Sequence, residues 1–170
     1  MTEKPELNWD QLNALTAEVI SEEGPWSAGW NAETSHTRRF NEALIEEFRA
    51  NAGVIPGELG DVDMLLLTVR GAKSGLPRVI PLSYHVIDGR ICVLASMGGA
   101  AKNPPWFYNV KANPDVTVEI GTETFTATAQ ITAGDDRDAL WAEVVRRMPI
   151  FGEYETRTDR TIPVIELVRD

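Results

Sequence analysis

The chain has 170 residues, of which 43% are hydrophobic and 25% charged, and its net charge is −10. These values predict one soluble domain with a single core, and they exclude an integral membrane protein because the longest apolar runs fall far short of the roughly 18 residues of a span. The acidic balance argues against nucleic acid as a partner, while the lone Cys92 and the lack of a secretory signal pattern favour a reducing cytoplasm.

An acidic segment opens the sequence. Residues 1–33 are expected to form an N-terminal extension that is partly helical, with a short helix over Gln11–Ile20. Because this extension is acidic, it should not be drawn to anionic lipid, which leaves only weak peripheral membrane association open. Residues 34–170 are expected to form a single domain. Its first element is a packing helix over His36–Ala50, with Gly53 available as a C-terminal cap.

The pair Asp88-Gly89 lies between two apolar runs and is a strong signal for a two-residue hairpin turn. In that register Ile87 lies opposite Arg90, and one face of the hairpin is apolar. We expect this face to be the core face, and its members are Leu82, Tyr84, Val86, Ile91, Val93 and Ala95.

A second hairpin is expected around Gly121-Thr122. Its predicted apolar face holds Val116, Val118, Phe125, Ala127, Ala129 and Ile131. Further apolar runs at Met64–Val69 and Pro163–Val168 bring the total to about six strands by the usual reading of such runs. The economical architecture is a closed or split antiparallel β-barrel with flanking helices, which is a mainly β fold of the α+β type.

Several chemistries are excluded by residue type and spacing. His85 lies opposite Cys92 in the first hairpin, but no nearby acid would orient the imidazole, so we interpret the pair as chance neighbours. The run Gly71-Ala-Lys-Ser is not a P-loop, because Ala and not Gly precedes the Lys. Two His and one Cys do not make a zinc site at any standard spacing, and we expect no metal. Ser96 lacks the glycine context of a hydrolase nucleophile.

Cations are concentrated in the middle of the chain. Residues 64–111 carry six Lys or Arg against one acid, so this segment has a charge of +5 and the rest of the chain −15. Two glycine-bearing stretches, Gly71–Arg78 and Gly98–Trp106, hold most of these cations, and we interpret them as the two halves of one anion-binding site. In the first stretch the glycines permit close backbone approach, and the hydrogen-bond donors for a phosphate or carboxylate are Lys73, Ser74 and Arg78. A surface turn with solvated cations is the alternative.

The second stretch combines open backbone with a predicted helix start. Asn103 reads as the N-cap and Pro104 as the first helical position. Lys102 adjoins this helix start, where backbone amides would point at an anion. Trp106 and Phe107 follow in the first turn and are expected to offer a flat apolar surface beside the charge, which suits a tricyclic ring with an acidic tail.

The order of these motifs resembles the deazaflavin-dependent nitroreductase family. The resemblance is carried by the run Leu65–Leu82 with its Gly71-Ala-Lys-Ser-Gly-Leu-Pro-Arg78, by Ala95-Ser-Met-Gly-Gly-Ala-Ala-Lys-Asn-Pro-Pro-Trp106, and by Asn109-Val-Lys-Ala-Asn-Pro114, and it continues through Tyr154–Arg160 and Ile162–Val164. It covers roughly residues 35 to 168 and implies a split β-barrel that binds coenzyme F420.

The resemblance also implies a set of site residues. The phosphate and oligoglutamate tail of F420 would be held by Lys73, Ser74, Gly75 and Arg78. The deazaflavin would be surrounded by Pro81, Leu82, Ser96, Met97, Gly98, Gly99, Ala100, Lys102, Asn103 and Trp106. The candidate catalytic residues are Tyr154, as an orienting group or proton donor, and Ser96. The sequence departs from the family pattern at Ala101, where a proline is usual, and at Phe151, where a tyrosine is common.

The implied reaction is hydride transfer from reduced F420 to a small electrophilic acceptor, namely an activated alkene, enone, quinone or nitro compound. Two alternatives stay open at this point. One is an FMN-binding split-barrel oxidoreductase, which would need fewer cations, and the other is a non-catalytic F420 carrier. The cation set Lys73, Arg78 and Lys102 favours the longer acidic tail of F420 over FMN. Assembly as a homodimer also stays open.

Overall fold

The computed structural model describes residues 35–55, 63–96, 99 and 101–170. The predicted extension over residues 1–33 and the predicted site residues Met97, Gly98 and Ala100 lie outside the described residues. In chain order the elements are α2 (Ser35–Ala50), β1 (Met64–Arg70), β2 (Pro77–Ile87), β3 (Arg90–Leu94), α3 (Pro105–Ala112), β4 (Asp115–Ile120), β5 (Glu123–Ile131), α4 (Gly134–Arg147), α5 (Ile150–Thr156) and β6 (Val164–Arg169).

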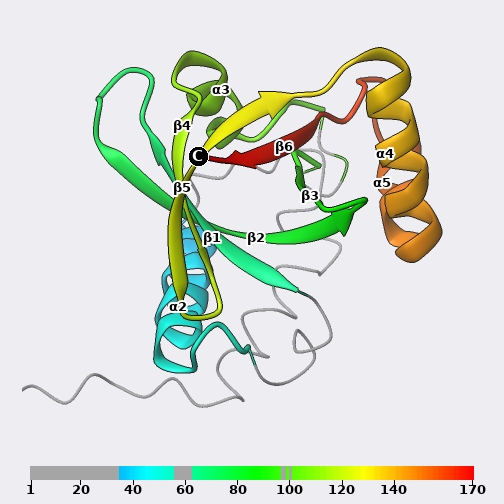
Figure 1. Cartoon of the computed structure of the whole chain (residues 1–170). Coiled ribbons are helices and arrows are strands. Elements are labelled where there is room, and N and C mark those ends of the chain that lie inside the picture. The colour runs from blue at the N-terminus through cyan, green and yellow to red at the C-terminus, as the bar shows by residue number, and fades with distance from the viewer. Residues whose placement is uncertain (1–34, 56–62, 97–98, 100) are drawn as a thin grey trace, which may run out of the picture.

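The strands form a closed antiparallel barrel in the order β1-β2-β3-β6-β5-β4, which β1 and β4 close. The last strand, β6, is inserted between β3 and β5 (Figure 1). Closure removes the exposed strand edges that an open sheet of this length would present to other chains. The predicted barrel of about six strands with flanking helices is therefore confirmed. None of the helices in the described part of the chain combines the length and apolar character that a membrane crossing requires.

Both predicted hairpins are confirmed in type and register. Ile87 pairs with Arg90, and the two turn residues between them have positive φ values, 51° at Asp88 and 76° at Gly89. Positive φ at both central positions is the geometry of a two-residue turn that follows the twist of its strands, which is why Asp-Gly is favoured there. In the second hairpin Ile120 pairs with Glu123 across an equally short turn.

The barrel interior is filled from all six strands and sealed at one end by α3. Strand residues such as Leu65, Val93 and Val118 are fully buried there, together with Trp106 and Phe107 of α3. The predicted core face of the first hairpin is partly confirmed, because Val93 and Ala95 are buried but Val86 is 48% exposed. If the hairpin had only one core face, the opposite face of β2 and β3 would be exposed to solvent. In the structure that opposite face is covered as well.

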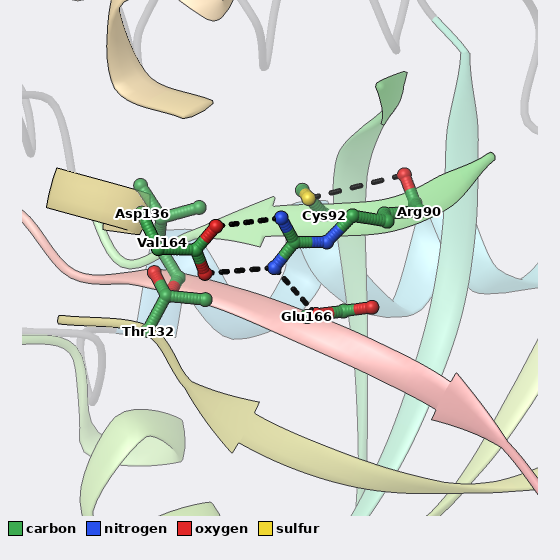
Figure 2. A network of polar contacts seen from close by, with 6 residues as sticks. All are labelled: Arg90, Cys92, Thr132, Asp136, Val164 and Glu166. Carbon is green, nitrogen blue, oxygen red and sulfur yellow. Dashed lines mark hydrogen bonds and ion pairs between the residues drawn. The ribbon is translucent and has the colours of Figure 1, made fainter. Parts of the chain in front are cut away.

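That opposite face lies beneath α4 and α5, two helices that were not assigned from the sequence. A second apolar cluster joins the sheet to these helices, and it contains Ile87, Cys92, Leu94, Leu140, Trp141, Val144, Phe151, Ile162 and Val164. The start of α4 has no side-chain cap, but Asp136 in its first turn pairs with a cation of the barrel. Arg90 of β3 donates two hydrogen bonds to the carboxylate of Asp136 and one to Glu166 of β6 (Figure 2). This network ties the helix start to two barrel strands.

The opposite side of the barrel is covered by α2, whose position was predicted. Leu44 and Phe48 of this helix are buried against Leu66 of β1. The helix ends at Ala50, and Gly53 adopts a φ of 82° while its amide donates to the carbonyl of Phe48 at 2.8 Å. The predicted glycine cap is confirmed, since a left-handed residue just beyond the helix satisfies one of its last carbonyls.

Candidate functional site

The first glycine-bearing stretch forms the tight turn between β1 and β2. The amide of Gly71 donates to the carbonyl of Leu76 at 2.8 Å, and the amide of Gly75 donates to the carbonyl of Gly71 at 2.9 Å. Ser74 Oγ accepts from the amide of Leu76 at 3.2 Å. Gly75 has a φ of 69°, a conformation that glycine adopts without strain. The turn is therefore shaped by its own hydrogen bonds, and the side chains of Lys73 and Arg78 extend into solvent.

The cations of this turn differ from most others in the described part of the chain. Elsewhere, carboxylates pair with Arg49, Arg90, Arg137, Arg146, Arg147 and Arg169. Within the described residues, Lys73, Arg78 and Lys102 form no ion pair and are exposed. A cation without a protein partner can bind an anionic ligand with no internal ion pair to break first. These three residues are available for that role.

The turn is joined to the start of the second stretch through α3. The backbone amide of Ala72 donates to Asn109 Oδ1 of α3 at 3.0 Å. In Figure 1 the β1–β2 turn and α3 lie at the same end of the barrel. Because α3 begins at Pro105, directly after the second stretch, this hydrogen bond holds both glycine-bearing stretches against one helix.

Arg160 holds the second stretch in place. Its Nη1 donates to the carbonyl of Ala95 at 3.1 Å and to Asn103 Oδ1 at 2.7 Å, and its Nη2 donates to the carbonyl of Ser96 at 2.8 Å. Hydrogen bonds from a charged donor each contribute about 1.5–3 kcal/mol when their partners are shielded from water. A single half-buried guanidinium thus connects the beginning of the Ala95–Asn103 loop with its end.

Gly99 is the point where this loop meets α5. Its amide donates to the carbonyl of Ser96 at 2.9 Å, and its φ is 81°. A Cβ added here would overlap the carbonyl oxygen of Tyr154 and crowd Cβ of Arg157. Glycine is therefore required twice, by backbone conformation and by the close approach of α5.

The predicted start of α3 needs a correction. Pro104, and not Asn103, is the N-cap, Pro105 is the first helical residue, and no side chain caps the helix. The side chain of Asn103 accepts from Arg160 instead. The predicted exposed aromatic surface is also absent from this conformation, because Trp106 is 6% exposed and Phe107 7% exposed within the barrel core. These rings are part of the barrel core directly after the loop.

Two other predicted residues lie in the barrel wall beside this end. Pro81 is buried and pairs with Leu66, whose side chain packs beneath α2, so Pro81 shares that outer face of the barrel wall. Leu82 pairs with Leu65 and is partly buried against the interior cluster. Both are supplied by β2, the same strand that continues from the cation-bearing turn.

Tyr154, the predicted catalytic tyrosine, lies on α5 beside the loop. Its ring packs edge-on against Phe151 with centroids 5.6 Å apart, and the guanidinium carbon of Arg157 lies 5.6 Å from the ring centroid. Burial raises the pKa of the Tyr154 phenol, and the charge of Arg157 opposes that shift. The phenol is therefore protonated at neutral pH and is in the form that can donate a proton.

His85 and Cys92 face each other across the hairpin as the predicted register requires. Burial raises the pKa of Cys92 to about 11 and lowers the pKa of His85, so the thiol stays protonated and the imidazole neutral. His85 packs edge-on against Phe151 at 5.6 Å. A buried, protonated thiol is a poor nucleophile, and the pair contributes to packing beneath α5.

The residues that sequence reasoning missed are those that connect the parts of the site. Asn109 and Arg160 both lie within the motifs that carried the family resemblance, but no role was predicted for either. Each acts on a segment distant in sequence, so no local spacing signals its contact. Their polar type within otherwise apolar or turn-forming stretches was the only available signal.

With this geometry described, comparison with known proteins identifies the family. The sequence model of the F420H2-dependent quinone reductase family matches residues 39–168. The chain belongs to this family. An F420H2-dependent quinone reductase of Mycobacterium tuberculosis (strain H37Rv) is 38% identical over 135 residues, which cover 77% of this chain and 89% of the relative. The match confirms the predicted family and, at the level of the family, the predicted cofactor and reductase activity.

Solved structures agree with this assignment. An F420-H2 dependent reductase (FDR-A) has a TM-score of 0.57 and 40% identity, and the alignment covers 62% of this chain and 93% of the other. A chain described as a domain-swapped dimer has a TM-score of 0.59 and 39% identity, with coverage of 72% and 90%. Both are similar to this barrel in sequence as well as in fold.

The residues of this site fit the F420 that the family name implies. The tail of F420 is anionic, and the β1–β2 turn offers Lys73 and Arg78 exposed and without carboxylate partners in the described part of the chain. Open space surrounds Gly75, so a ligand can approach the turn closely. Arg160 joins Ala95 and Ser96 to Asn103 in the second stretch, which leads directly into α3.

Proposed function

We propose that this protein is an F420-dependent reductase whose acceptor is a quinone or a related electrophile. The observation that carries the proposal is the pairing of two unlike features at one barrel end in a member of this family. These are exposed cations that form no ion pair within the described residues, and a glycine-bearing loop whose two ends are joined by a guanidinium. When bound, reduced F420 supplies the hydride.

In this proposal the residues of the chain bind the tail of F420, orient its ring system and protonate the acceptor. Lys73, Arg78 and Lys102 neutralise the anionic tail, with Ser74 and Gly75 shaping the turn that presents them. The Ala95–Asn103 loop and the β2 wall at Pro81 and Leu82 orient the ring system, and Trp106 supports the loop from the core. Ser96 is the loop residue whose carbonyl both Arg160 and Gly99 use.

Tyr154 is the proposed proton donor. Reduction of a quinone to a hydroquinone takes one hydride and one proton, so the acceptor needs a proton source near its developing oxyanion. The phenol of Tyr154 is protonated at neutral pH, and its backbone already contacts the loop at Gly99. Arg157 beside the ring would stabilise the negative charge that the phenol acquires when the proton leaves.

The setting of the protein is also a proposal. We place it in the cytoplasm, where a single buried thiol remains reduced and a diffusible cofactor is accessible. We propose a small-molecule acceptor and no nucleic-acid partner, because the chain is acidic overall. We propose a homodimer as the assembly state, since one solved relative is described as a domain-swapped dimer.

The proposal is tested by fluorescence titration with F420 and, separately, with FMN at low and high salt. The wild-type protein should bind F420 more tightly than FMN, and Lys73→Ala and Arg78→Ala should each weaken F420 binding about three- to tenfold at low salt and less at high salt. Arg146→Ala is the matched control, because this exposed cation pairs with Glu143 on α4. FMN preference would contradict the cofactor assignment.

Turnover separates the reductase from the carrier alternative. With reduced F420 and a soluble quinone, the wild-type protein should oxidise many equivalents of reduced F420 per protein molecule. The reaction is monitored through the loss of the absorbance of the quinone. Tight F420 binding without turnover, across quinones, enones and nitro compounds, would favour a non-catalytic carrier.

A further inference from the structure

We propose that Arg160 is a positioning residue for F420, because it bridges the two ends of the Ala95–Asn103 loop and so fixes Ala95, Ser96 and Asn103 relative to one another. This inference rests on the proposed function, since it concerns the same site. It adds a residue whose described hydrogen bonds go to the loop and to Thr158, outside the cation-bearing turn. Its effect on the reaction would pass through the loop.

The bridge joins positions that the local backbone does not connect. The carbonyls of Ala95 and Ser96 lie where the chain leaves β3, and Asn103 lies where it approaches α3. One guanidinium reaches all three acceptors at 2.7–3.1 Å. The only other described hydrogen bond within the loop is the short one from the amide of Gly99 to the carbonyl of Ser96. Arg160 therefore joins the two ends of the loop, in addition to the other contacts that hold its described residues.

The backbone segment that carries Arg160 is itself anchored by hydrogen bonds. Its amide donates to Thr158 Oγ1 at 3.3 Å, and the segment that follows is anchored to the barrel. The buried Arg137 donates from Nε and Nη2 to the carbonyl of Ile162 at 3.2 and 2.7 Å, and the amide of Ala95 donates to the carbonyl of Pro163 at 3.1 Å. A donor on an anchored segment can define the position of a loop, whereas one on a free segment would follow it.

The geometry requires arginine and not a generic cation. A planar guanidinium carries five N–H donors in a fixed fork, so it can serve diverging acceptors at once. A lysine at this position would bring a single ammonium group on a flexible stem, and it could not span the same three oxygens. All three acceptors are neutral oxygens of the loop, so the hydrogen bonds determine geometry and do not merely balance charge.

α5 adds a second constraint that depends on the first. Gly99 lies against the carbonyl of Tyr154, with no room for a Cβ between them. If Arg160 is lost, the ends of the loop are released and Gly99 can move away from α5. The position of the loop relative to Tyr154 is then no longer fixed. We therefore expect loss of Arg160 to weaken F420 binding and also to lower turnover of the complex that still forms.

The test compares Arg160→Ala, Arg160→Lys and Asn103→Ala with the wild type and with Arg146→Ala as a control for removal of an exposed arginine. Arg160→Ala should raise the Kd for F420 about 10- to 100-fold, because misplacement of a binding surface by about 1 Å has effects of this size. Arg160→Lys should not restore binding. The loss should be the same at low and high salt, in contrast to that of Lys73→Ala.

Two readouts do not depend on turnover. In the absence of cofactor, hydrogen exchange at the Gly99 amide should be faster in Arg160→Ala than in the wild type, while exchange in β1 and β6 is unchanged. Ethylguanidinium added to Arg160→Ala should restore part of the F420 affinity and should have no effect on Lys73→Ala. If Arg160→Ala does not fold, Asn103→Ala, which removes one acceptor only, should show the same changes with smaller amplitude.

The outcomes separate this inference from the proposed function. Wild-type protein that does not bind F420 would overturn the proposed function itself. Wild-type protein that binds F420, with Arg160→Ala and Asn103→Ala both within twofold of its affinity and with unchanged Gly99 exchange, would overturn the positioning role alone. A salt-sensitive loss in Arg160→Ala that Arg160→Lys repairs would also overturn it, since that result would indicate a charge role.

Discussion

The two halves of the candidate site are built on opposite principles. The β1–β2 turn is held mainly by hydrogen bonds among its own residues, with one more to Asn109 of α3, and it presents Lys73 and Arg78 to solvent. In the Ala95–Asn103 loop, the described residues are held by Arg160 at both ends and by the close approach of Gly99 to α5. We therefore expect F420 binding by the first half to depend strongly on salt. We expect the contribution of the second half to depend little on salt and more on the distant residues that hold it.

Matched glycine substitutions give the largest expected contrast between the two halves. Gly99 and Gly75 both have positive φ values, 81° and 69°, but only Gly99 is crowded by another part of the backbone. Gly99→Ala should lower F420 affinity about 100-fold, because the loop or α5 must move by a large fraction of an ångström. Gly75→Ala should lower it about fivefold, which corresponds to the roughly 1 kcal/mol penalty for a left-handed alanine.

The measurement is the F420 titration, with thermal unfolding of each variant to separate binding from stability. Gly134→Ala serves as a control far from the site, because Gly134 has a φ of 60° and open space around it. Equal losses of affinity in Gly99→Ala and Gly75→Ala would remove the distinction between the shaped loop and the charged turn.

A substitution of Tyr154 tests whether the half of the site formed by the Ala95–Asn103 loop and α5 also takes part in the reaction. Tyr154→Phe should lower kcat for quinone reduction about tenfold and leave the Kd for F420 unchanged, since it removes the phenol but keeps the ring against Phe151. Solvent can supply the missing proton, which keeps the loss at this modest size. Because burial raises the pKa of the phenol, kcat of the wild type should be flat between pH 7 and 9.

A drop of kcat in the wild type over that range, absent from Tyr154→Phe, would mean that the phenol titrates in a more exposed setting than the structure shows. An unchanged kcat in Tyr154→Phe would assign proton delivery to water or another group.

The smallest expected effect concerns the packing beneath α5, the helix that contacts the Ala95–Asn103 loop. His85 packs under Phe151 of α5, and burial, with Arg147 nearby, lowers its pKa while Asp63 opposes the shift. A group whose pKa is lower in the folded protein takes up protons more readily when unfolded, so stability is lost as pH falls below the ordinary histidine value of about 6.5. The unfolding temperature of the wild type should fall by a few degrees between pH 7 and pH 5.

His85→Leu should reduce this dependence. His36, the other histidine of the chain, remains in the variant and reports any contribution of its own. An identical pH dependence in the wild type and His85→Leu would show that other groups govern stability in this range. F420 affinity should follow the unfolding trend only weakly, because the Arg137 and Arg160 contacts hold the loop from a different segment.

The hairpins, α2 and the charged turn could be predicted because their signals are local. Asp88-Gly89 defines its own register, Gly53 ends its own helix, and Lys73 and Arg78 lie within a few residues of the glycines that expose them. Each of these features is decided by neighbours in sequence, where spacing carries the information.

The shaped loop could not be predicted in the same way. Pro104 and Pro105 both permit a helix start, and only the structure shows that Asn103 is taken by Arg160 and is unavailable as a cap. Likewise, apolar Trp106 and Phe107 were compatible with a ligand surface or with core, and closure of the barrel end decided for the core. These outcomes depend on partners far apart in sequence, which a single sequence does not pair.

The position of β6 has a consequence for how the protein is made. This strand follows the other barrel strands in the sequence, yet it lies between β3 and β5, and the segment that leads into it carries Arg160. On the ribosome, the earlier strands emerge with two edges that only β6 can join. The barrel and the loop therefore assemble in the same late step, and a stalled or shortened nascent chain would expose sticky edges and lack a competent cofactor site.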